Sequence, residues 1–173
     1  QPNQQQTHKK PAATRGKRIL VVDDNATNRE ILRVRLTSWG AEVVVVSDGP
    51  TALATMAQTD TSFDMVITDM QMPEMDGLTL GRAIRQEDRF KDIPLVMMTS
   101  LGQQNSSGEL AEIGFVASLT KPIRPSELHT RLIEVLSGTQ PAKSERSLPE
   151  SDPTSISLDS NARILLAEDN LTN

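Results

Sequence analysis

Five short apolar runs, separated by stretches with helical spacing, constrain the fold of this chain more than any other feature. The runs are rich in β-branched side chains and occupy Ile19–Val22, Val43–Val46, Met65–Thr68, Leu95–Thr99 and Val116–Thr120. Between them, apolar residues recur three or four positions apart, as in Leu32, Leu36 and Trp39, in Leu53, Met56 and Ala57, and in Leu128, Leu132 and Leu136. Pro125-Ser126-Glu127 is a suitable start for the last helix. Strands that alternate with helices over five units predict an α/β fold, with helices on both faces of a parallel sheet.

Two polar segments flank this region. Residues 1–16 contain no large apolar side chain, and residues 138–162 are rich in serine, proline and charge, so neither can offset its ordering entropy by burial. They also explain a hydrophobic content of 36%, which is below the roughly 45–50% of an average globular chain. The sequence therefore predicts a flexible N-terminal linker at 1–16, one domain at 17–137 and a Ser/Pro-rich linker at 138–162.

One internal repeat follows the second linker. The segment Arg18–Asn28 recurs as Arg163–Asn173, with seven of eleven positions identical and an eighth exchanging Asp for Glu. A generic strand and turn would repeat apolar character but not the shared Asp-Asn-x-Thr-Asn. We therefore expect residues 163–173 to be the truncated start of a second domain of the same kind, in a segment of a longer protein.

The composition excludes several classes of function. Without cysteine the chain has no disulfide scaffold and no thiol nucleophile, and its two histidines, His8 and His129, leave little for histidine-based metal chemistry. His129 is expected at the surface of the last helix. No apolar run approaches the ~20 residues that span a bilayer, and a formal charge of −5 argues against a nucleic-acid-binding domain. We expect a soluble, cytoplasmic chain with no direct contact to membrane or nucleic acid, and no pattern indicates an oligomeric state.

Polar residues follow four of the five predicted strands directly. They are Asp23 and Asp24 after the first, Asp69 after the third, Thr99 and Ser100 where the fourth ends, and Lys121 and Pro122 after the fifth. Each element alone fits an ordinary cap or turn. Because ligands of open α/β sheets bind at the carboxyl ends of the strands, their convergence at one edge indicates a functional site.

The residue types then select a chemistry. Carboxylates brought close together repel one another unless a cation joins them, and Mg²⁺ prefers such oxygen ligands while keeping waters and bridging to phosphate. Lysine suits a phosphoryl oxygen as a point charge, and a threonine hydroxyl can donate to another. This set fits phosphoryl transfer, with Asp69 as the nucleophile that forms an aspartyl phosphate.

These segments resemble the receiver domain of response regulators in two-component phosphorelay signalling. The matching pieces are Val21–Asn25, Ile67–Gly77, Met98–Ser100 and Leu119–Pro122, in the family's order and spacing over roughly residues 17–137. The resemblance implies a flavodoxin-like three-layer sandwich, with a five-stranded parallel sheet of order 2-1-3-4-5 and five helices.

The resemblance also implies individual roles. Asp69 matches the phosphoacceptor; Asp23, Asp24, Asp69 and the backbone carbonyl of Gln71 match the Mg²⁺ ligands; Thr99 matches the switch hydroxyl; Lys121 matches the lysine ahead of a cis proline, Pro122. One position departs from the family. Many receivers have Tyr or Phe three residues before this lysine, where this chain has Ser118. We expect phosphorylation to persist and the aromatic half of the threonine–aromatic switch to be altered.

A subgroup of the family is similar in further details. Asn25–Asn28, Trp39-Gly40, Leu101-Gly102 and the second copy resemble the first of tandem receivers in hybrid sensor histidine kinases. This implies a phosphohistidine donor in the same parent chain, which can be anchored in the inner membrane, and a histidine phosphotransfer domain as a further partner. Neither His8 nor His129 lies in a kinase or phosphotransfer motif, so the donor histidine lies elsewhere.

Two other functions are compatible with part of this pattern. A phosphatase of the haloacid-dehalogenase type would need a second aspartate two residues after the nucleophile, where this chain has Gln71. A pseudo-receiver that no longer accepts phosphate would lack the acceptor, the acidic pair or the lysine, and this chain keeps all of them. The chain is therefore expected to be a phosphoacceptor signalling domain rather than an enzyme.

Overall fold

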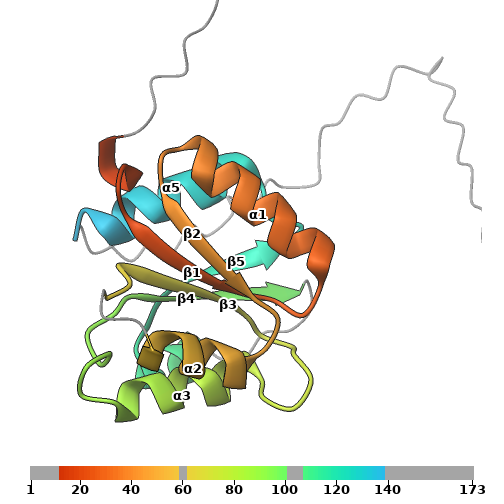
Figure 1. The fold of residues 1–173 in the computed structure, drawn as a ribbon, viewed down its shortest axis with the longest axis vertical. Coiled ribbons are helices and arrows are strands. Elements are labelled where there is room, and N and C mark those ends of the chain that lie inside the picture. Colours follow the sequence, from red (N-terminus) through yellow and green to blue (C-terminus); the bar gives the residue numbers. More distant parts are fainter. Residues whose placement is uncertain (1–11, 59–61, 101–106, 139–173) are drawn as a thin grey trace, which may run out of the picture. The chain divides into compact units, whose positions relative to one another are not determined.

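The computed structural model describes residues 12–58, 62–100 and 107–138, which form a three-layer α/β sandwich (Figure 1). Its strands are β1 (Arg18–Val22), β2 (Glu42–Val46), β3 (Met65–Asp69), β4 (Leu95–Ser100) and β5 (Phe115–Lys121). Its helices are a short 3₁₀ helix η1 (Ala12–Thr14) and the α-helices α1 (Ala26–Ser38), α2 (Gly49–Gln58), α3 (Gly77–Gln86), α4 (Ser107–Ile113) and α5 (Pro125–Leu136). The five predicted strands are confirmed to within two residues at either end, and α5 begins at Pro125 as predicted.

The five strands form one parallel sheet of order β2-β1-β3-β4-β5, as the family resemblance implied. The register aligns the strands closely, with Val21 opposite both Val45 and Ile67, and Ile67 opposite Val96. All strands therefore run in the same direction and end at the same edge of the sheet. β3 is the central strand and β1 is one of its neighbours, so the carboxyl ends of these two strands lie next to each other at that edge.

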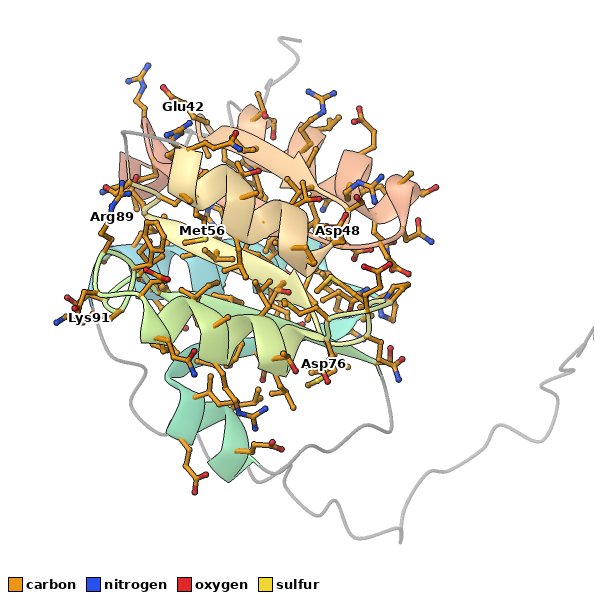
Figure 2. All side chains as sticks on the ribbon, turned by 60° about the horizontal axis from the view of Figure 1, so that its bottom comes forward. Glu42, Asp48, Met56, Asp76, Arg89 and Lys91 are labelled. Carbon is orange, nitrogen blue, oxygen red and sulfur yellow. The ribbon has the colours of Figure 1, made fainter. Side chains whose placement is uncertain are left out.

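Each face of the sheet has its own apolar layer, because alternate side chains of a strand point to opposite faces. Helices α1 and α5 cover one face and α2 and α3 the other (Figure 1). On β1, Ile19 and Val21 pack towards α1 and α5, whereas Leu20 and Val22 belong to the cluster under α2, α3 and α4. Figure 2 shows Met56 on α2 at this second layer, where the side chain is 1% exposed.

The central strands are buried on both faces, as near-continuous apolar runs predict. β3 is buried at every position, but β5 is an edge strand on which burial alternates, and Val116, Ser118 and Thr120 are exposed. The methionines after β3 have a packing role, since Met70 and Met72 are buried in the core cluster.

The N-terminal boundary differs from the predicted one. Within the segment predicted as linker, η1 packs against α5, and the buried Thr14 donates from Oγ1 to the carbonyl of Trp39 at 2.8 Å. Gly16 also donates from its backbone nitrogen to the carbonyl of Gly40 at 2.9 Å. Residues 12–16 therefore pack with the domain. Because a short polar segment gives no local sign of what it packs against, the sequence alone did not predict this.

His129 is half-buried rather than a free surface residue. Its ring meets Trp39 edge-to-face, with 5.0 Å between ring centroids and 71° between ring planes. The contact joins the end of α1 to α5, so His129 has a packing role in the structure.

Residues 1–11 and 139–173, with the predicted second linker and second receiver start, lie outside the described residues. Within the described part of the chain, no helix is long and apolar enough to cross a bilayer.

Candidate functional site

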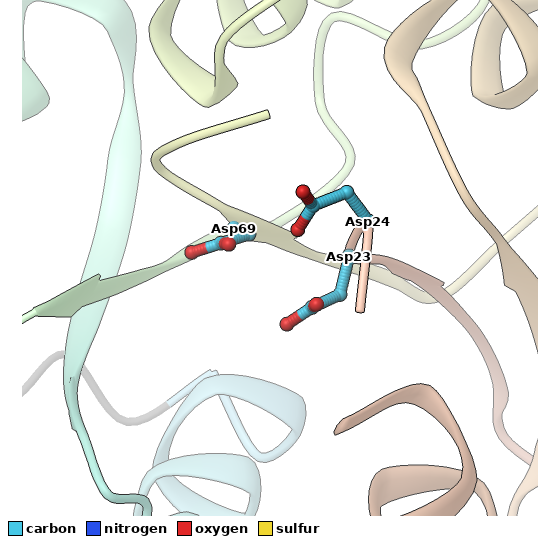
Figure 3. Close-up of side chains that lie close together, drawn as sticks. All are labelled: Asp23, Asp24 and Asp69. Atoms are coloured by element: carbon cyan, nitrogen blue, oxygen red, sulfur yellow. The ribbon is translucent and has the colours of Figure 1, made fainter. Parts of the chain in front are cut away.

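Three carboxylates meet where β1 and β3 end (Figure 3). Asp23 and Asp24 follow β1, and Asp69 is the last residue of β3; one carboxylate oxygen from each lies within 4.8 Å of the others. Asp23 is fully buried and Asp69 is 6% exposed, whereas Asp24 faces solvent. Parallel pairing of β1 with β3 produces this convergence, as the sequence predicted.

Lys121, at the end of β5, joins two of these carboxylates. Its Nζ lies 2.8 Å from Oδ2 of Asp69 and 3.0 Å from Oδ2 of Asp23. The peptide bond from Lys121 to Pro122 is cis, as the resemblance implied. One ammonium thus pairs with two of the three clustered carboxylates, so negative charge remains in excess at this edge of the sheet.

The surroundings shift the protonation equilibria of the central pair. Burial raises the pKa of Asp69, Lys121 opposes that rise without cancelling it, and the negative charge of Asp23 adds to it. Burial also disfavours the charged form of Lys121, but the hydrogen bonds and charges of Asp69 and Asp23 prevail and raise the lysine pKa. Lys121 is therefore held as a cation, and the carboxylate charge favours binding of a further cation.

The first turn of α1 orients the buried carboxylate. Asn25 caps the helix, and its backbone nitrogen donates to Oδ1 of Asp23 at 2.8 Å. Asn28 donates from Nδ2 to both oxygens of Asp23 at 3.3 Å, and Arg29 donates to the main chain of the acidic pair. Sequence reasoning did not assign Asn28 and Arg29 to the site. Their position one turn into a helix that starts directly after Asp23-Asp24 was the available signal.

The donor set suits a hard divalent cation. Carboxylate oxygens and water are the ligands that Mg²⁺ prefers, and the exposed Asp24 beside two buried carboxylates leaves one side of the cluster open to solvent. The parts for phosphoryl transfer are also present, because a lysine lies within hydrogen-bond distance of a candidate carboxylate nucleophile.

Comparisons with known proteins decide the family. A sequence model described as the response regulator receiver domain matches residues 19–133. The chain belongs to the receiver domains of response regulators. It is 35% identical over 130 residues to the phosphate regulon transcriptional regulatory protein PhoB of Pseudomonas aeruginosa, covering 75% of this chain and 56% of that protein. The chain spans somewhat over half the length of the first curated relatives that it matches.

Solved receiver structures have the same fold. The chemotaxis response regulator CheY4 of Vibrio cholerae superposes with a TM-score of 0.64 at 31% identity, covering 69% of this chain and 98% of CheY4. The receiver domain of a sensor histidine kinase from Pseudomonas aeruginosa, solved with magnesium coordinated in its active-site cleft, gives 0.63 at 27% identity and covers 70% and 98% of the two chains.

The remaining predicted site residues of this receiver lie on β4, on β5 and in the loop after β3. Thr99, near the end of β4, is 9% exposed, and its Oγ1 donates to the carbonyl of Leu119 at 3.5 Å. Ser118 is exposed and pairs in register with Met97, two residues before the threonine. Gln71 is exposed in the loop after β3. The structure thus brings Asp23, Asp24, Asp69 and Lys121 together and places Thr99 on the neighbouring strand.

A groove opens beside the acidic cluster of this receiver. It has a volume of about 460 Å³ and runs between α1 and the segment that joins β5 to α5. Ile31 and Leu32 line it from α1, Ile123 and Leu128 line it from the other side, and Lys121 reaches it from the site. Ile31 is 52% exposed, so it forms an apolar rim of the groove that Asp23 and Lys121 also line.

Proposed function

We propose that this receiver accepts a phosphoryl group on Asp69 from a phosphohistidine, in a reaction that depends on Mg²⁺. The observation that carries the proposal is the position of Lys121 Nζ, within 3.0 Å of both Asp69 and Asp23 inside an otherwise acidic cluster. Such a lysine can bind the oxygens of a transferring phosphoryl group while the neighbouring carboxylates hold a metal. If Lys121 served only as a structural partner of Asp23 and Asp69, the third carboxylate, the exposed Asp24, would not be needed beside them.

The proposed mechanism assigns one task to each residue. A carboxylate oxygen of Asp69 attacks phosphorus, the bond from phosphorus to the histidine nitrogen breaks, and the electron pair of that bond stays on the imidazole. Lys121 is placed to follow the phosphoryl oxygens as their negative charge shifts towards Asp69. Asp23, Asp24, Asp69 and the backbone carbonyl of Gln71 would hold Mg²⁺, which supplies charge neutralisation on the phosphoryl oxygens.

Phosphorylation of Asp69 would then cause a conformational change. The phosphoryl group brings a charge of about −2 and strong acceptor oxygens to the end of β3. We infer that Thr99 turns its hydroxyl from the long 3.5 Å bond with Leu119 towards these oxygens. Because Ser118 stands where many receivers have an aromatic residue and is already exposed, we propose that the conformational change passes through β4 rather than through an aromatic rotation.

The apolar groove is the proposed docking place for the phosphohistidine domain. A donor that reaches Asp69 must cover Lys121, and the groove continues from Lys121 to the apolar rim at Ile31. The partners are thus proposed to be a histidine kinase domain and a histidine phosphotransfer domain, met in the cytoplasm. Absence of direct nucleic-acid and membrane contact stays a prediction from the sequence.

For the parent protein we propose a hybrid histidine kinase with tandem receivers. The repeat of Arg18–Asn28 at Arg163–Asn173 supports this arrangement, and receivers of histidine kinases are among the similar solved structures. A stand-alone transcriptional regulator is the second candidate, because PhoB is among the similar curated proteins. Sequencing the parent gene on both sides of the segment that encodes this chain distinguishes them, since the hybrid kinase requires a histidine kinase domain in the same gene and the rest of a receiver after Asn173.

The proposed reaction is tested with a small acyl phosphate as donor and intact-mass spectrometry as the readout. We expect one phosphoryl adduct on the wild type with Mg²⁺, none with excess chelator, and none in Asp69→Asn. A wild type that gains no adduct would move the assignment to a pseudo-receiver. An adduct that persists in Asp69→Asn would refute the acceptor residue.

A further inference from the structure

Arg29 lies directly behind the turn that carries the acidic pair. It is the fourth residue of α1, and its Nη1 donates to the backbone carbonyl of Asp23 at 2.7 Å and to that of Asp24 at 2.9 Å. One guanidinium nitrogen therefore ties two consecutive peptide groups to the helix. Both bonds are on the main-chain side of the turn, so they leave the carboxylate oxygens available.

The two carboxylates differ in what holds them. The side chain of Asp23 is buried and accepts hydrogen bonds from Asn25, Asn28 and Lys121. Asp24 is exposed, and the bond from Arg29 holds its backbone. Because like charges at Asp23, Asp24 and Asp69 repel one another, the turn would relax outward without a restraint, and a relaxed turn would present its oxygens at the wrong spacing for one cation.

We propose that Arg29 is a positioning residue that fixes the Asp23-Asp24 turn for binding of a divalent cation. The inference rests on the proposed function. Groups that orient metal ligands without touching the metal commonly change metal affinity by about 10–100-fold when they are removed. Arg29 is of this kind, since it contacts the main chain of the ligands rather than the reacting atoms.

The positive charge of Arg29 and its positioning of the turn have opposite effects on the affinity for a divalent cation, so the direction of the change on mutation distinguishes them. A cation next to a metal site repels the metal, so a residue that acted only through charge would weaken binding, and its removal would strengthen it. A positioning residue does the reverse. The direction of the change in affinity therefore separates positioning from a purely electrostatic role.

The test measures Mn²⁺ binding, counted as free Mn²⁺ by electron paramagnetic resonance, on the full chain without any phosphodonor. Arg29→Met removes the donors and keeps most of the alkyl stem, and Arg29→Gln is a second neutral variant should the first not fold. Arg33→Met is the matched control, because Arg33 lies on the same helix and pairs with Glu30 on the exposed side. Thermal unfolding of the metal-free proteins shows that each variant is folded.

We expect Arg29→Met to bind Mn²⁺ about tenfold more weakly than the wild type and Arg33→Met to bind it equally well. Arg29→Lys should recover most of the lost affinity, because one ammonium nitrogen can also donate to two carbonyls. Equal or tighter binding by Arg29→Met overturns the inference, as does an equal loss in Arg29→Lys. A wild type that binds no Mn²⁺ at all overturns the proposed function as well, so the two failures are distinguishable.

Discussion

The Nζ of Lys121 lies 2.8 Å from Oδ2 of Asp69, although 52 positions separate the two residues in the chain. The lysine comes from the end of an edge strand and the aspartate from the end of a central strand. Their contact exists because the parallel strands end at one edge, so the fold itself builds the ion pair.

Replacement of this lysine is predicted to separate catalysis from metal binding. Lys121→Met should lower the rate of phosphorylation by an acyl phosphate about tenfold or more, because a charged hydrogen bond to the phosphoryl group is worth ~1.5–3 kcal/mol. Mg²⁺ should bind at least as tightly, since a competing cation is gone. Rapid-quench kinetics and calorimetric titration of Mg²⁺ measure the two quantities. Phosphorylation at the wild-type rate would contradict the role given to Lys121.

Asp64 is predicted to make stability depend on acid pH. Burial would raise its pKa, but the backbone N–H of Arg18 and the ammonium of Lys17, each 2.8 Å away, prevail and lower it from the usual 3.8. A lowered pKa in the folded state stabilises the protein above 3.8, and this stabilisation is lost as the pH falls through the folded-state value.

Asp64→Asn should therefore lower the free energy of unfolding at neutral pH by about 1 kcal/mol, a small value because the carboxylate is one-third exposed. Urea titrations at several pH values measure the difference from the wild type. It should shrink steadily below pH 3.8. A difference that stays constant down to low pH would mean that the carboxylate charge does not act there.

Gly77, the first residue of α3, is predicted to tolerate no side chain. A Cβ at this position would overlap the backbone carbonyl of Asp69 and lie 2.9 Å from the sulfur of Met97. Gly77→Ala should therefore cost about 2 kcal/mol or more in stability and should slow phosphorylation, because the acceptor must move. Gly108→Ala on α4 is the matched control, since a Cβ there meets no atom within 4 Å. Equal stability of the two variants would refute the close packing at Asp69.

Ile31 is predicted to matter for the protein donor and not for the chemistry. Ile31→Asp places a charge in the apolar rim of the groove and should slow transfer from a phosphohistidine domain about tenfold or more, while the rate with an acyl phosphate stays unchanged. Val116→Asp on β5, where the side chain is 44% exposed, serves as control. If both variants transfer at the wild-type rate, the groove is not the docking place.

The sequence predicted the parts of this structure that depend on strand ends. Asp23, Asp24, Asp69 and Lys121 could be found because each follows an apolar run directly and parallel strands must end together. The sheet order came only from the family resemblance, since strand and helix alternation alone allows several orders.

The sequence did not predict contacts that depend on how helices lie against loops. The hydrogen bonds from Arg29 to the backbone carbonyls of Asp23 and Asp24 depend on the length and path of the turn before α1. The edge-to-face contact of His129 with Trp39 and the docking of η1 depend on where α1 and α5 lie on the sheet. Neither periodicity nor residue type contains this information, because each contact joins positions that have no common local pattern.

The acceptor assignment is tested most directly by trapping the acyl phosphate. Borohydride reduces an aspartyl phosphate to homoserine, and peptide mass spectrometry then locates the reduced position in protein treated with a phosphohistidine donor and Mg²⁺. The account predicts reduction at Asp69 alone, abolished by chelator. Reduction at Asp23, Asp24 or another carboxylate, or no reduction in the presence of a competent donor, would contradict it.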